Sequence, residues 1–402
     1  MKKIKSIAIV WEQIDWGGVD SYLLYLLNNE KFKQIDVTIF SNENNKGLKR
    51  FVKLNKNLSV KIVKYKSLLN LELKNTLLKK FYFFFKPIFF VFTYFQLKQL
   101  LGKDKFDVYF GVCGGYGQIR GEMAGTLSAS SLKIPVISLG IHHACVFPPP
   151  FMNFFISLVN NRISKIISSV ITVSEATKKT LFFKSNLLDN DKIDTVIIHH
   201  GVSSEPIKNK DDSINKSKNI LEAGIISRIE EYKGHRDLIN AINKLPKDYL
   251  EKIRINIIGD GELKEMESLR LLVKSYGLNN VIFKGYVDKP ITEIINELDL
   301  VLSLTRSFEG FGLSLLEGAS QGIPIIATDV GAVTEFLDRN FSLIIKPSSP
   351  EEIKERLIDF IENKEKWSEK AKVYKDIILS NFNEDKMAEQ YINHFNQKLN
   401  TK

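Results

Sequence analysis

Cysteine is nearly absent from this sequence, since only Cys113 and Cys145 occur among its 402 residues. Two cysteines cannot form a disulfide framework, and no zinc-binding spacing accompanies them. A reducing compartment, the cytosol, is therefore the simplest expectation. The composition also excludes a largely disordered or collagen-like chain, because 44% of the residues are hydrophobic and 26% are charged, as in ordinary globular proteins.

Uninterrupted apolar runs of membrane-spanning length are missing as well. The amino terminus MKKIKSIAIVWEQ has a basic start and a short apolar run, but Glu12 and Asp15 follow and there is no small-residue cleavage site. We expect a first buried strand there and not a signal peptide. The phenylalanine-rich stretch 77–101 is interrupted by Lys86 and Pro87, so its apolar runs are shorter than a membrane span.

The same stretch, LLKKFYFFFKPIFFVFTYFQLKQLL, combines aromatic residues with flanking lysines. This composition favours the membrane interface, and the alternative is a long core helix or a pair of core helices. The formal net charge of +10 favours anionic partners, such as phosphorylated ligands or an anionic lipid surface, unless it only reflects a lysine-rich composition. No basic motif with interleaved aromatic residues indicates a nucleic-acid module, so no nucleic-acid partner is expected.

Short apolar runs alternate with helical patterns, which indicates α/β domains with parallel sheets covered on both faces. A helix is also expected at about 119–131, and residues 350–400 have a helical pattern throughout. The runs that predict strands are 6–11, 36–40, 59–64, 107–112, 134–140, 169–174 and 194–201 in the first half, and 220–226, 253–259, 280–285, 300–304, 323–329 and 342–347 in the second.

Residues 203–219 are polar and charged, which is typical of a linker. The expected fold class is α/β, with two Rossmann-like, doubly wound domains facing a central cleft, and ligands beyond the carboxyl ends of the strands. We expect a first domain at 1–203, a linker at 204–218, a second domain at 219–380, and a carboxyl-terminal helix at 381–402 that could cross back to the first domain.

The segment FEGFGLSLLEGAS places two carboxylates around a glycine-rich turn. Gly310 and Gly312 let the backbone turn tightly and approach a ligand. The helix that follows offers free N–H groups and a partial positive charge for a phosphate. Glu309 and Glu317 can accept hydrogen bonds from sugar hydroxyl groups. The combination favours a phosphorylated sugar, whereas a single glutamate near a helix start could simply compensate the helix dipole.

Glu309 and Glu317, followed by GASQGIPIIATDVGAVTE, resemble the paired-glutamate signature of the retaining family 4 glycosyltransferases, or glycosyl transferases group 1. The resemblance covers most of the chain, is strongest at 220–337, and implies the two-domain GT-B fold. It implies that Glu309 acts at the donor sugar and that Glu317 binds the ribose hydroxyls. The residues whose backbone would meet the sugar or phosphate are Gly310, Phe311, Gly312 and Leu313.

Other segments of the second half extend the resemblance. GIISRIEEYKGHRDLINAI matches a family segment in which Arg228 and Lys233 would bind the donor diphosphate, whose charge grows in the transition state. INIIGDGE resembles the second glycine turn of the family, which implies a donor contact at Gly259, although such turns are often architectural. FKGYV resembles the loop that meets the nucleotide base through the backbone near Val287.

The first half matches more loosely. WGGVDSYLLYL resembles the family's glycine pair after the first strand, which implies that the backbone of Gly17 and Gly18 approaches the diphosphate. IPVISLGIHHA resembles the loop with the active-site histidine. The resemblance favours His142 as the catalytic histidine and His143 as a second donor contact, and the two adjacent histidines leave the register open. His200 stands where the family commonly has asparagine.

Asp189, Asn190 and Asp191 fit the metal-binding Asp-x-Asp pattern of another glycosyltransferase fold. They lie in a polar loop before a strand, so we interpret them as a turn. The resemblance implies no metal and no other cofactor, with Arg228 and Lys233 supplying the positive charge.

The resemblance implies a retaining glycosyltransferase that moves a sugar from a UDP- or GDP-sugar to a glycan acceptor. Domain closure would exclude water from the donor. The charge and the stretch 77–101 favour a lipid-linked acceptor, a peripheral position on the inner face of the plasma membrane, and a role in bacterial capsule or lipopolysaccharide assembly. One alternative is a non-catalytic glycosyltransferase-like binding subunit. Another is a nicotinamide-dependent oxidoreductase or an epimerase, which would need a G-x-G-x-x-G motif that WGGVDS lacks.

Overall fold

The computed structural model describes residues 2–14, 16–71, 76–188, 193–203 and 220–401. The linker expected at 204–218 and the turn expected at 189–191 lie outside the described residues. The chain divides into two compact units, each built on its own sheet. The first unit consists of Met1–Gly201 and Glu384–Lys402, and the second of Val202–Asn383.

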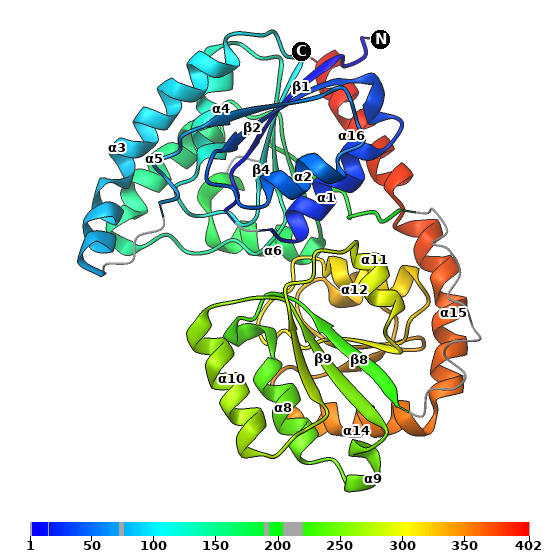
Figure 1. Ribbon diagram of the computed structural model, residues 1–402. Helices are drawn as coiled ribbons and strands as arrows, with labels where there is room; N and C mark the ends of the chain where they lie inside the picture. Colours follow the sequence, from blue (N-terminus) through cyan, green and yellow to red (C-terminus); the bar gives the residue numbers. More distant parts are fainter. Residues whose placement is uncertain (1, 15, 72–75, 189–192, 204–219, 402) are drawn as a thin grey trace. The chain divides into compact units, whose positions relative to one another are not determined.

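The first unit has a parallel sheet in the order β3-β2-β1-β4-β5-β6-β7 (Figure 1). The direction in which strands are added reverses between the neighbours β1 and β4. The central strands are buried on both faces, as their continuous apolar sequences predict. The strands are β1 (Ser6–Trp11), β2 (Asp36–Asn42), β3 (Val60–Tyr65), β4 (Val108–Cys113), β5 (Val136–Ile141), β6 (Ser169–Thr172) and β7 (Asp194–Ile197).

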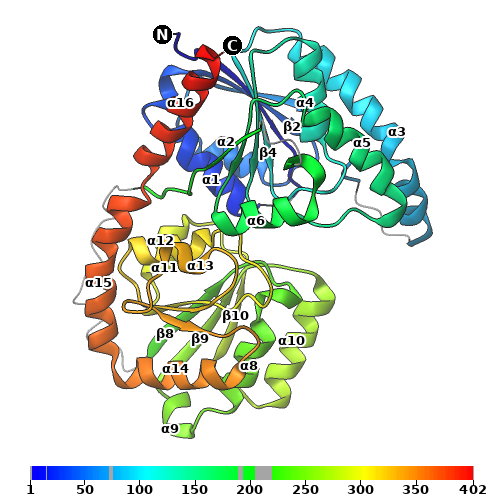
Figure 2. The same cartoon turned by 180° about the vertical axis from the view of Figure 1, so that it is seen from behind.

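Helices cover both faces of this sheet (Figures 1 and 2). One face packs on α3, α4 and α5, and the other on α1, α2 and α16. The helices are α1 (Gly18–Asn28), α2 (Leu48–Leu54), α3 (Thr76–Leu101), α4 (Gly121–Ser131), α5 (Asn153–Ile163), α6 (Glu175–Lys184) and α16 (Glu384–Asn400), with short 3₁₀ turns η1 (Phe32–Gln34), η2 (Pro150–Met152) and η3 (Asn186–Leu188).

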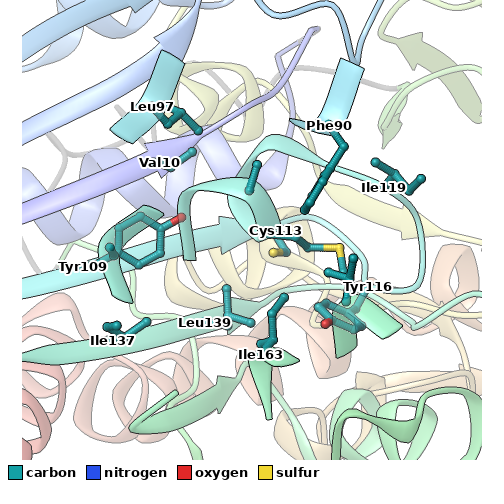
Figure 3. Close-up of a cluster of buried hydrophobic side chains, with 14 of the residues drawn as sticks. Val10, Phe90, Leu97, Tyr109, Cys113, Tyr116, Ile119, Ile137, Leu139 and Ile163 are labelled. Atoms are coloured by element: carbon teal, nitrogen blue, oxygen red, sulfur yellow. The ribbon is translucent and has the colours of Figure 1, made fainter. Parts of the chain in front are cut away.

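Helix α3 is one continuous helix of 26 residues that contains Pro87. Its inner side buries Phe90 and Leu97 in a core with Val10 and Tyr109 (Figure 3). Its outer side leaves several large aromatic side chains exposed. The sequence therefore combined both readings of this segment, a core helix and an exposed aromatic surface. Within the described residues, no helix is both long enough and apolar enough to cross a membrane.

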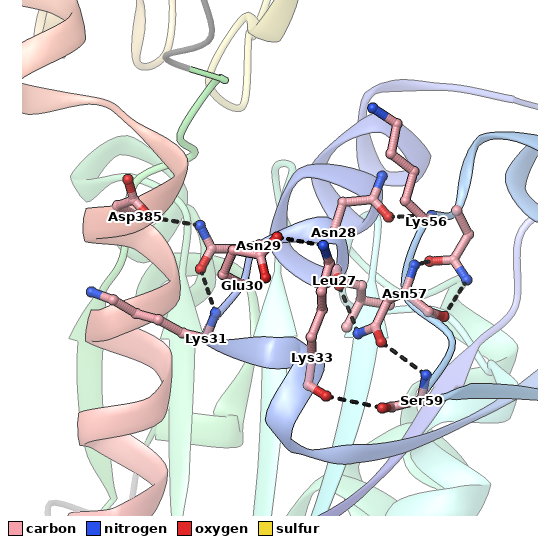
Figure 4. A network of polar contacts seen from close by, with 11 residues as sticks. Leu27, Asn28, Asn29, Glu30, Lys31, Lys33, Lys56, Asn57, Ser59 and Asp385 are labelled. Atoms are coloured by element: carbon pink, nitrogen blue, oxygen red, sulfur yellow. Dashed lines mark hydrogen bonds and ion pairs between the residues drawn. The ribbon is translucent and has the colours of Figure 1, made fainter.

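Helix α16 comes from the far end of the chain and packs within the first unit against α1 and β5 (Figures 1 and 2). The rings of Tyr391 and Phe395 lie 5.6 and 5.5 Å from that of Phe110 in β4. Asn29 Nδ2 also donates to Asp385 Oδ1 at 2.9 Å (Figure 4). Aromatic burial and a polar network at the end of α1 therefore hold this helix in place.

The second unit has a parallel sheet in the order β10-β9-β8-β11-β12-β13, which reverses between the neighbours β8 and β11. The strands are β8 (Leu221–Ile226), β9 (Ile253–Ile258), β10 (Val281–Gly285), β11 (Leu300–Ser303), β12 (Ile325–Thr328) and β13 (Leu343–Ile345). The helices are α8 (His235–Asn243), α9 (Lys247–Leu250), α10 (Leu263–Ser275), α11 (Ile291–Asn296), α12 (Leu313–Ser320), α13 (Val333–Phe336), α14 (Pro350–Glu362) and α15 (Lys364–Asn381), with the 3₁₀ turn η4 (Glu231–Lys233).

Each apolar run that predicted a strand contains one of these strands, and the helix expected at 119–131 is α4. The helical region expected at 350–400 is divided into α14, α15 and α16. The second break falls where Asn383 forms a parallel bridge with Val202. Two parallel, doubly wound sheets confirm the α/β class.

Candidate active site

Two loops of the second unit meet where the strand order reverses. The neighbours β8 and β11 lead at their carboxyl ends into loops 227–234 and 304–312. Ligands of open α/β sheets bind beyond the carboxyl ends of the strands at such a reversal point. Arg306 N donates to Tyr232 O at 2.7 Å and so joins the two loops directly.

A largely buried ion pair connects the same loops. Lys233 Nζ lies 2.8 Å from Glu309 Oε2, and 14% of each side chain is exposed. Thr305 Oγ1 donates to the same carboxylate oxygen at 3.1 Å. Burial opposes the charged form of Lys233, but the Glu309 carboxylate outweighs this effect and raises the pKa of the lysine. A permanently charged ammonium group therefore lies at the reversal point.

A second ion pair fixes the loop that carries Glu309. Arg306 Nε and Nη2 donate to the two carboxylate oxygens of Asp237, each at 2.7 Å. Asp237 is buried in the first turn of α8, and its hydrogen bonds raise the pKa of Arg306. Two parallel bonds hold the guanidinium plane in one orientation. The start of loop 304–312 is therefore tied to α8.

Glycine is required where these loops contact neighbouring backbone. Gly331 has φ +60°, and a Cβ atom on it would lie 2.1 Å from Glu309 O. Ala332 N donates to that same oxygen at 2.9 Å. Gly234 has φ +79°, and its Cβ would lie 2.0 Å from Leu304 O. The backbone of Glu309 is thus positioned by a close approach that only glycine allows.

Helix α12 begins beside the ion pair. Its first cap is Gly312 in the left-handed region, and no side chain among the described residues caps this end. A Cβ on Gly312 would lie 3.3 Å from Glu309 Cγ, which places the helix start against the carboxylate side chain. Phe311 is buried, with its ring 4.9 Å from that of Phe336, so this residue can offer a ligand only its backbone. Glu317 lies one turn into the helix and is 3% exposed.

The other predicted donor residues of this unit lie on adjoining loops. Arg228 is on loop 227–234 with Lys233, is more than half exposed and pairs with Glu230 at 2.8 Å. Gly259 has φ +139°, and a Cβ on it would lie 1.9 Å from Ser227 O. Packing against the loop of Arg228 therefore accounts for this glycine without a ligand. Val287 follows β10, the edge strand two places from β8.

The glycine pair of the first unit has no such packing reason. Gly17 is the extended first cap of α1, and its N donates to Asp20 Oδ2 at 2.5 Å. A Cβ on Gly17 would make only an ordinary contact of 3.8 Å, and one on Gly18 would meet nothing within 4 Å. Neither the backbone of Gly17 nor the packing of either residue demands glycine at this helix start.

Sequence analysis missed a buried acid pair at the reversal point of the first unit. Glu12 follows β1 directly and Glu122 lies in the first turn of α4, and both are buried. Glu12 Oε2 accepts a hydrogen bond from Gly121 N at 2.7 Å, so its carboxyl group caps α4. Burial raises the pKa of Glu122 to about 8 and also raises that of Glu12. An acid directly after an apolar strand, and another in a helix of small residues, were the available signals.

The two adjacent histidines of the first unit have different surroundings. His142 is buried, and its Nδ1 lies 2.9 Å from Nε2 of His200. Burial lowers the pKa of His142 to about 3 and lowers that of His200 well below its usual range. His143 is half-buried and lies near Gly115 of the loop after β4. Further along, Ser174 caps α6 as expected, by accepting from Thr177 N at 3.0 Å.

Comparison with known proteins adds family information. Residues 206–375 match the family model described as "Glycosyl transferases group 1". Over 252 residues, covering 61% of this chain and 63% of the relative, the sequence is 31% identical to "Uncharacterized glycosyltransferase MJ1069" of Methanocaldococcus jannaschii. It is also 31% identical, over 50% of this chain and 55% of the relative, to "O-antigen biosynthesis glycosyltransferase WclY" of Escherichia coli. The chain thus spans less than two thirds of either relative.

A solved structure is similar over nearly the whole chain. It is Anabaena Alr3699/HepE in complex with UDP-glucose, with a TM-score of 0.74 at 15% identity, covering 99% of this chain and all of the other. At this identity the likeness concerns the fold alone, and it confirms the GT-B fold expected from the sequence.

Proposed function

The chain belongs to the glycosyl transferases group 1 family, and on that premise we propose that it is a retaining glycosyltransferase acting on a nucleotide-sugar donor. In this proposal the donor binds the second unit, at the reversal point between β8 and β11. The acceptor binds the first unit. UDP- and GDP-sugars are the donor classes considered, and UDP-glucose is the ligand of a protein with the same fold.

The observation that carries the proposal is the Lys233–Glu309 pair beside the start of α12. A nucleoside diphosphate gains charge as it leaves the sugar, and a fixed ammonium group together with free helix N–H groups would stabilise that charge. Arg228, exposed on the same loop as Lys233, would add a second cation. The site therefore combines three sources of positive potential with one sugar-facing carboxylate.

The two units differ in a way that supports this assignment. In the first unit, the start of α4 at the reversal point already holds the carboxyl group of Glu12. In the second unit, no side chain among the described residues caps the start of α12. A helix start that holds a carboxylate cannot also receive a phosphate at the same N–H groups. The diphosphate is therefore assigned to α12.

The roles proposed for the site residues follow from their positions. Glu309 would accept hydrogen bonds from the donor sugar, and Glu317 would accept them from the ribose. The backbone from Gly310 to Leu313 would meet the sugar or phosphate, because the Phe311 side chain is buried. Gly17 and Gly18 would let a diphosphate or acceptor approach α1, since packing does not explain glycine there. Gly259 and Val287 would lie towards the nucleotide.

We propose a lipid-linked glycan as the acceptor and an anionic membrane face as a docking surface. The outer side of α3 exposes aromatic and aliphatic side chains at helical spacing, and α3 and α5 contain no acidic residue. We call this the aromatic surface, formed by Phe81, Phe84, Phe85, Ile88, Phe92 and Phe95. Helix α5 lies beside α3, where Phe155 meets Phe90, and it exposes Phe154 (Figures 1 and 2). Aromatic residues without negative charge suit an anionic interface.

The cellular role proposed is assembly of a bacterial surface polysaccharide at the inner face of the plasma membrane. Relatives named for O-antigen synthesis support this role. A peripheral position on the membrane would follow from the aromatic surface. The sugar, the acceptor and the linkage are left to experiment.

The donor assignment is tested by a thermal-shift screen with UDP-glucose, UDP-N-acetylglucosamine, GDP-mannose and ADP-glucose, followed by assays of donor hydrolysis and transfer. We expect one donor class to stabilise the protein and to be turned over. Lys233→Met and Glu317→Ala should each weaken binding at least about tenfold. The matched control is Lys244→Met, which breaks only a surface pair with Glu351. Equal binding by wild type, K233M and E317A would refute the site, and stabilisation without turnover would favour the non-catalytic alternative.

The membrane proposal is tested by flotation with vesicles of phosphatidylcholine, with and without phosphatidylglycerol. We expect binding to the anionic vesicles and a loss of about tenfold in the variant Phe84→Ser, Phe92→Ser, Phe95→Ser. The control is Leu263→Ser with Leu271→Ser, which removes two exposed apolar side chains from α10 of the second unit. Equal flotation of both variants would contradict the proposal.

A further inference from the structure

His142 and His143 directly follow strand β5, so their side chains leave the chain on opposite sides. His142 N continues the pairing of β5 with β4 by donating to Cys113 O at 3.0 Å. Only one of the two imidazoles can therefore be turned towards a ligand from this strand end. The contacts of each ring decide which one it is.

Both nitrogens of the His142 ring face the interior. Nδ1 lies 2.9 Å from His200 Nε2, and Nε2 lies 3.1 Å from the position that a Cβ on Gly140 would take. The same position is 2.6 Å from the ring of Phe110, so the imidazole is folded back along β5 over the core. A ring in this orientation does not reach beyond the carboxyl edge of the sheet.

The pair of His142 and His200 is enclosed by aromatic side chains. The ring of Tyr22 in α1 lies 4.3 Å from that of His142 and 4.7 Å from that of His200. Tyr391 of α16 lies 6.0 Å beyond Tyr22. Burial keeps both imidazoles uncharged, so one donates a hydrogen bond and the other accepts it. This pair joins β5, residue 200 and α1 in one packed unit.

His143 lies on the other side, where three strand-end loops of the first unit meet. Its Cβ is 4.0 Å from the Cβ position of Gly115, which follows β4. Gln13, which follows β1, has its Nε2 3.1 Å from the Cβ position of Gly114. Gln13 and His143 are both half-buried, and they flank a glycine pair at the point where the strand order reverses. This is where ligands of such sheets bind.

Glycine at position 115 is needed to keep these loops together. A Cβ there would lie 2.8 Å from Ala144 O, so a larger residue would push the loop of His143 away. Gly117 has φ +105°, and its Cβ would lie 1.9 Å from Val146 O. Val146 N donates to Tyr116 O at 2.8 Å and closes the contact. The loop that carries His143 is thus fixed by packing along its length.

We propose that His143, flanked by Gln13 and the turn of Gly114 and Gly115, is the ligand-facing histidine of the first unit. The hydrogen-bonded pair of His142 and His200 is a buried support that holds the loop of His143 in position. This inference rests on the proposed function, since the ligand is a nucleotide sugar or its acceptor. It reverses the preference that the sequence gave to His142.

The first test compares kinetics with stability in the full chain, with UDP-glucose, UDP-N-acetylglucosamine and GDP-mannose as donor probes. His143→Gln should lower kcat at least about 100-fold and leave Tm unchanged. His142→Gln and His200→Leu should lower Tm by several degrees, because each leaves a buried imidazole without its partner. His200→Asn, whose amide can replace the hydrogen bond, should recover most of that loss. A fall in Tm for His143→Gln as large as that for His142→Gln would overturn the division of roles.

The second test reads the rings directly by nitrogen-15 NMR of histidine-labelled protein, whose six histidines can be assigned by single substitutions. We expect the His142 ring to stay uncharged from pH 8 to pH 5, and added donor to move the signals of His143 but not those of His142. Titration of His142 near pH 6.5 would refute the support role with or without a donor. Absence of any donor effect on the wild-type protein would instead refute the proposed function.

Discussion

Lys233 and Glu309 are 76 positions apart in the sequence, yet Nζ of the first lies 2.8 Å from Oε2 of the second. The pair joins the loops after β8 and β11, the strands between which the sheet reverses its order. Glu309 holds the ammonium group in place and keeps it charged. A diphosphate that binds Lys233 would compete with Glu309 for that ammonium, which would free carboxylate oxygen for sugar hydroxyl groups.

Gly331 should be needed for donor binding because it positions the backbone of Glu309. Gly331→Ala places a methyl group 2.1 Å from Glu309 O and should weaken donor binding at least about tenfold. The matched control is Gly277→Ala, which has a similar φ, +65° against +60°, but no neighbour within 4 Å. The control should lose only about 1–2 kcal/mol of stability to backbone strain. Thermal unfolding and calorimetric titration of both variants measure the difference, and equal donor affinity in the two would contradict it.

Arg306→Lys should destabilise the loop that carries Glu309. Lysine cannot make both 2.7 Å bonds to Asp237 in one plane, and Asp237 is largely buried. We expect a loss of about 1.5–3 kcal/mol in the free energy of unfolding, together with a lower kcat/KM. The control is Arg339→Lys, at an exposed pair with Asp329, where the change should be below about 1 kcal/mol. Indistinguishable denaturation curves for the two variants would show that the orientation of Arg306 does not matter.

Glu122→Gln should stabilise the protein at neutral and alkaline pH. The pKa of Glu122 is raised from its ordinary 4.5 to about 8, so the native state must keep a proton that the unfolded chain has released. The stability that this group contributes is present below pH 4.5 and is lost as the pH rises towards 8. The Tm difference between E122Q and wild type should therefore grow from pH 5 to pH 8. Glu43→Gln, at an exposed site of the same unit, should show no such trend.

Acid should destabilise the chain before its carboxylates are protonated. Burial lowers the pKa of His142 to about 3 and that of His235 to about 4, so both stay neutral in the native state while the unfolded chain takes up protons below pH 6.5. Their contribution is complete above pH 6.5 and is lost as the pH falls towards 3, by up to about 1.4 kcal/mol per pH unit for each group. Tm measured from pH 7 to pH 5 should fall, and the fall should be smaller in His235→Gln. A flat Tm profile in the wild-type protein would be inconsistent with both burials.

The strands were predictable because the signal is local. Runs such as SIAIVW and DVYFGV are apolar throughout, and the strands they form are buried on both faces. The glycine turn before α12 was predictable for the same reason, since Gly312 with its left-handed backbone lies beside Glu309 in sequence. Helix α3 required the structure, because its composition fitted both a core helix and an interface.

The missed features are contacts between distant positions. Glu12 meets Glu122 and Gly121 across 110 and 109 positions, and His142 meets His200 across 58. Composition gives no indication of such pairings, because an isolated glutamate or histidine looks like a surface residue or a catalytic one. The register of the two histidines could not be resolved for the same reason, since it depends on which side of β5 each ring leaves.

The return of α16 to the first unit places the two ends of the chain together. Lys2 N donates to Asn400 Oδ1 at 2.9 Å, and Ile4 N donates to Asn396 Oδ1 at 2.8 Å. A fragment cut at Gly201 would lose Tyr391 and Phe395 from its interior and leave Phe110 uncovered. A circularly permuted gene, in which codons 384–402 precede codon 2, would encode the first unit as one uninterrupted polypeptide and allow acceptor recognition to be studied in isolation.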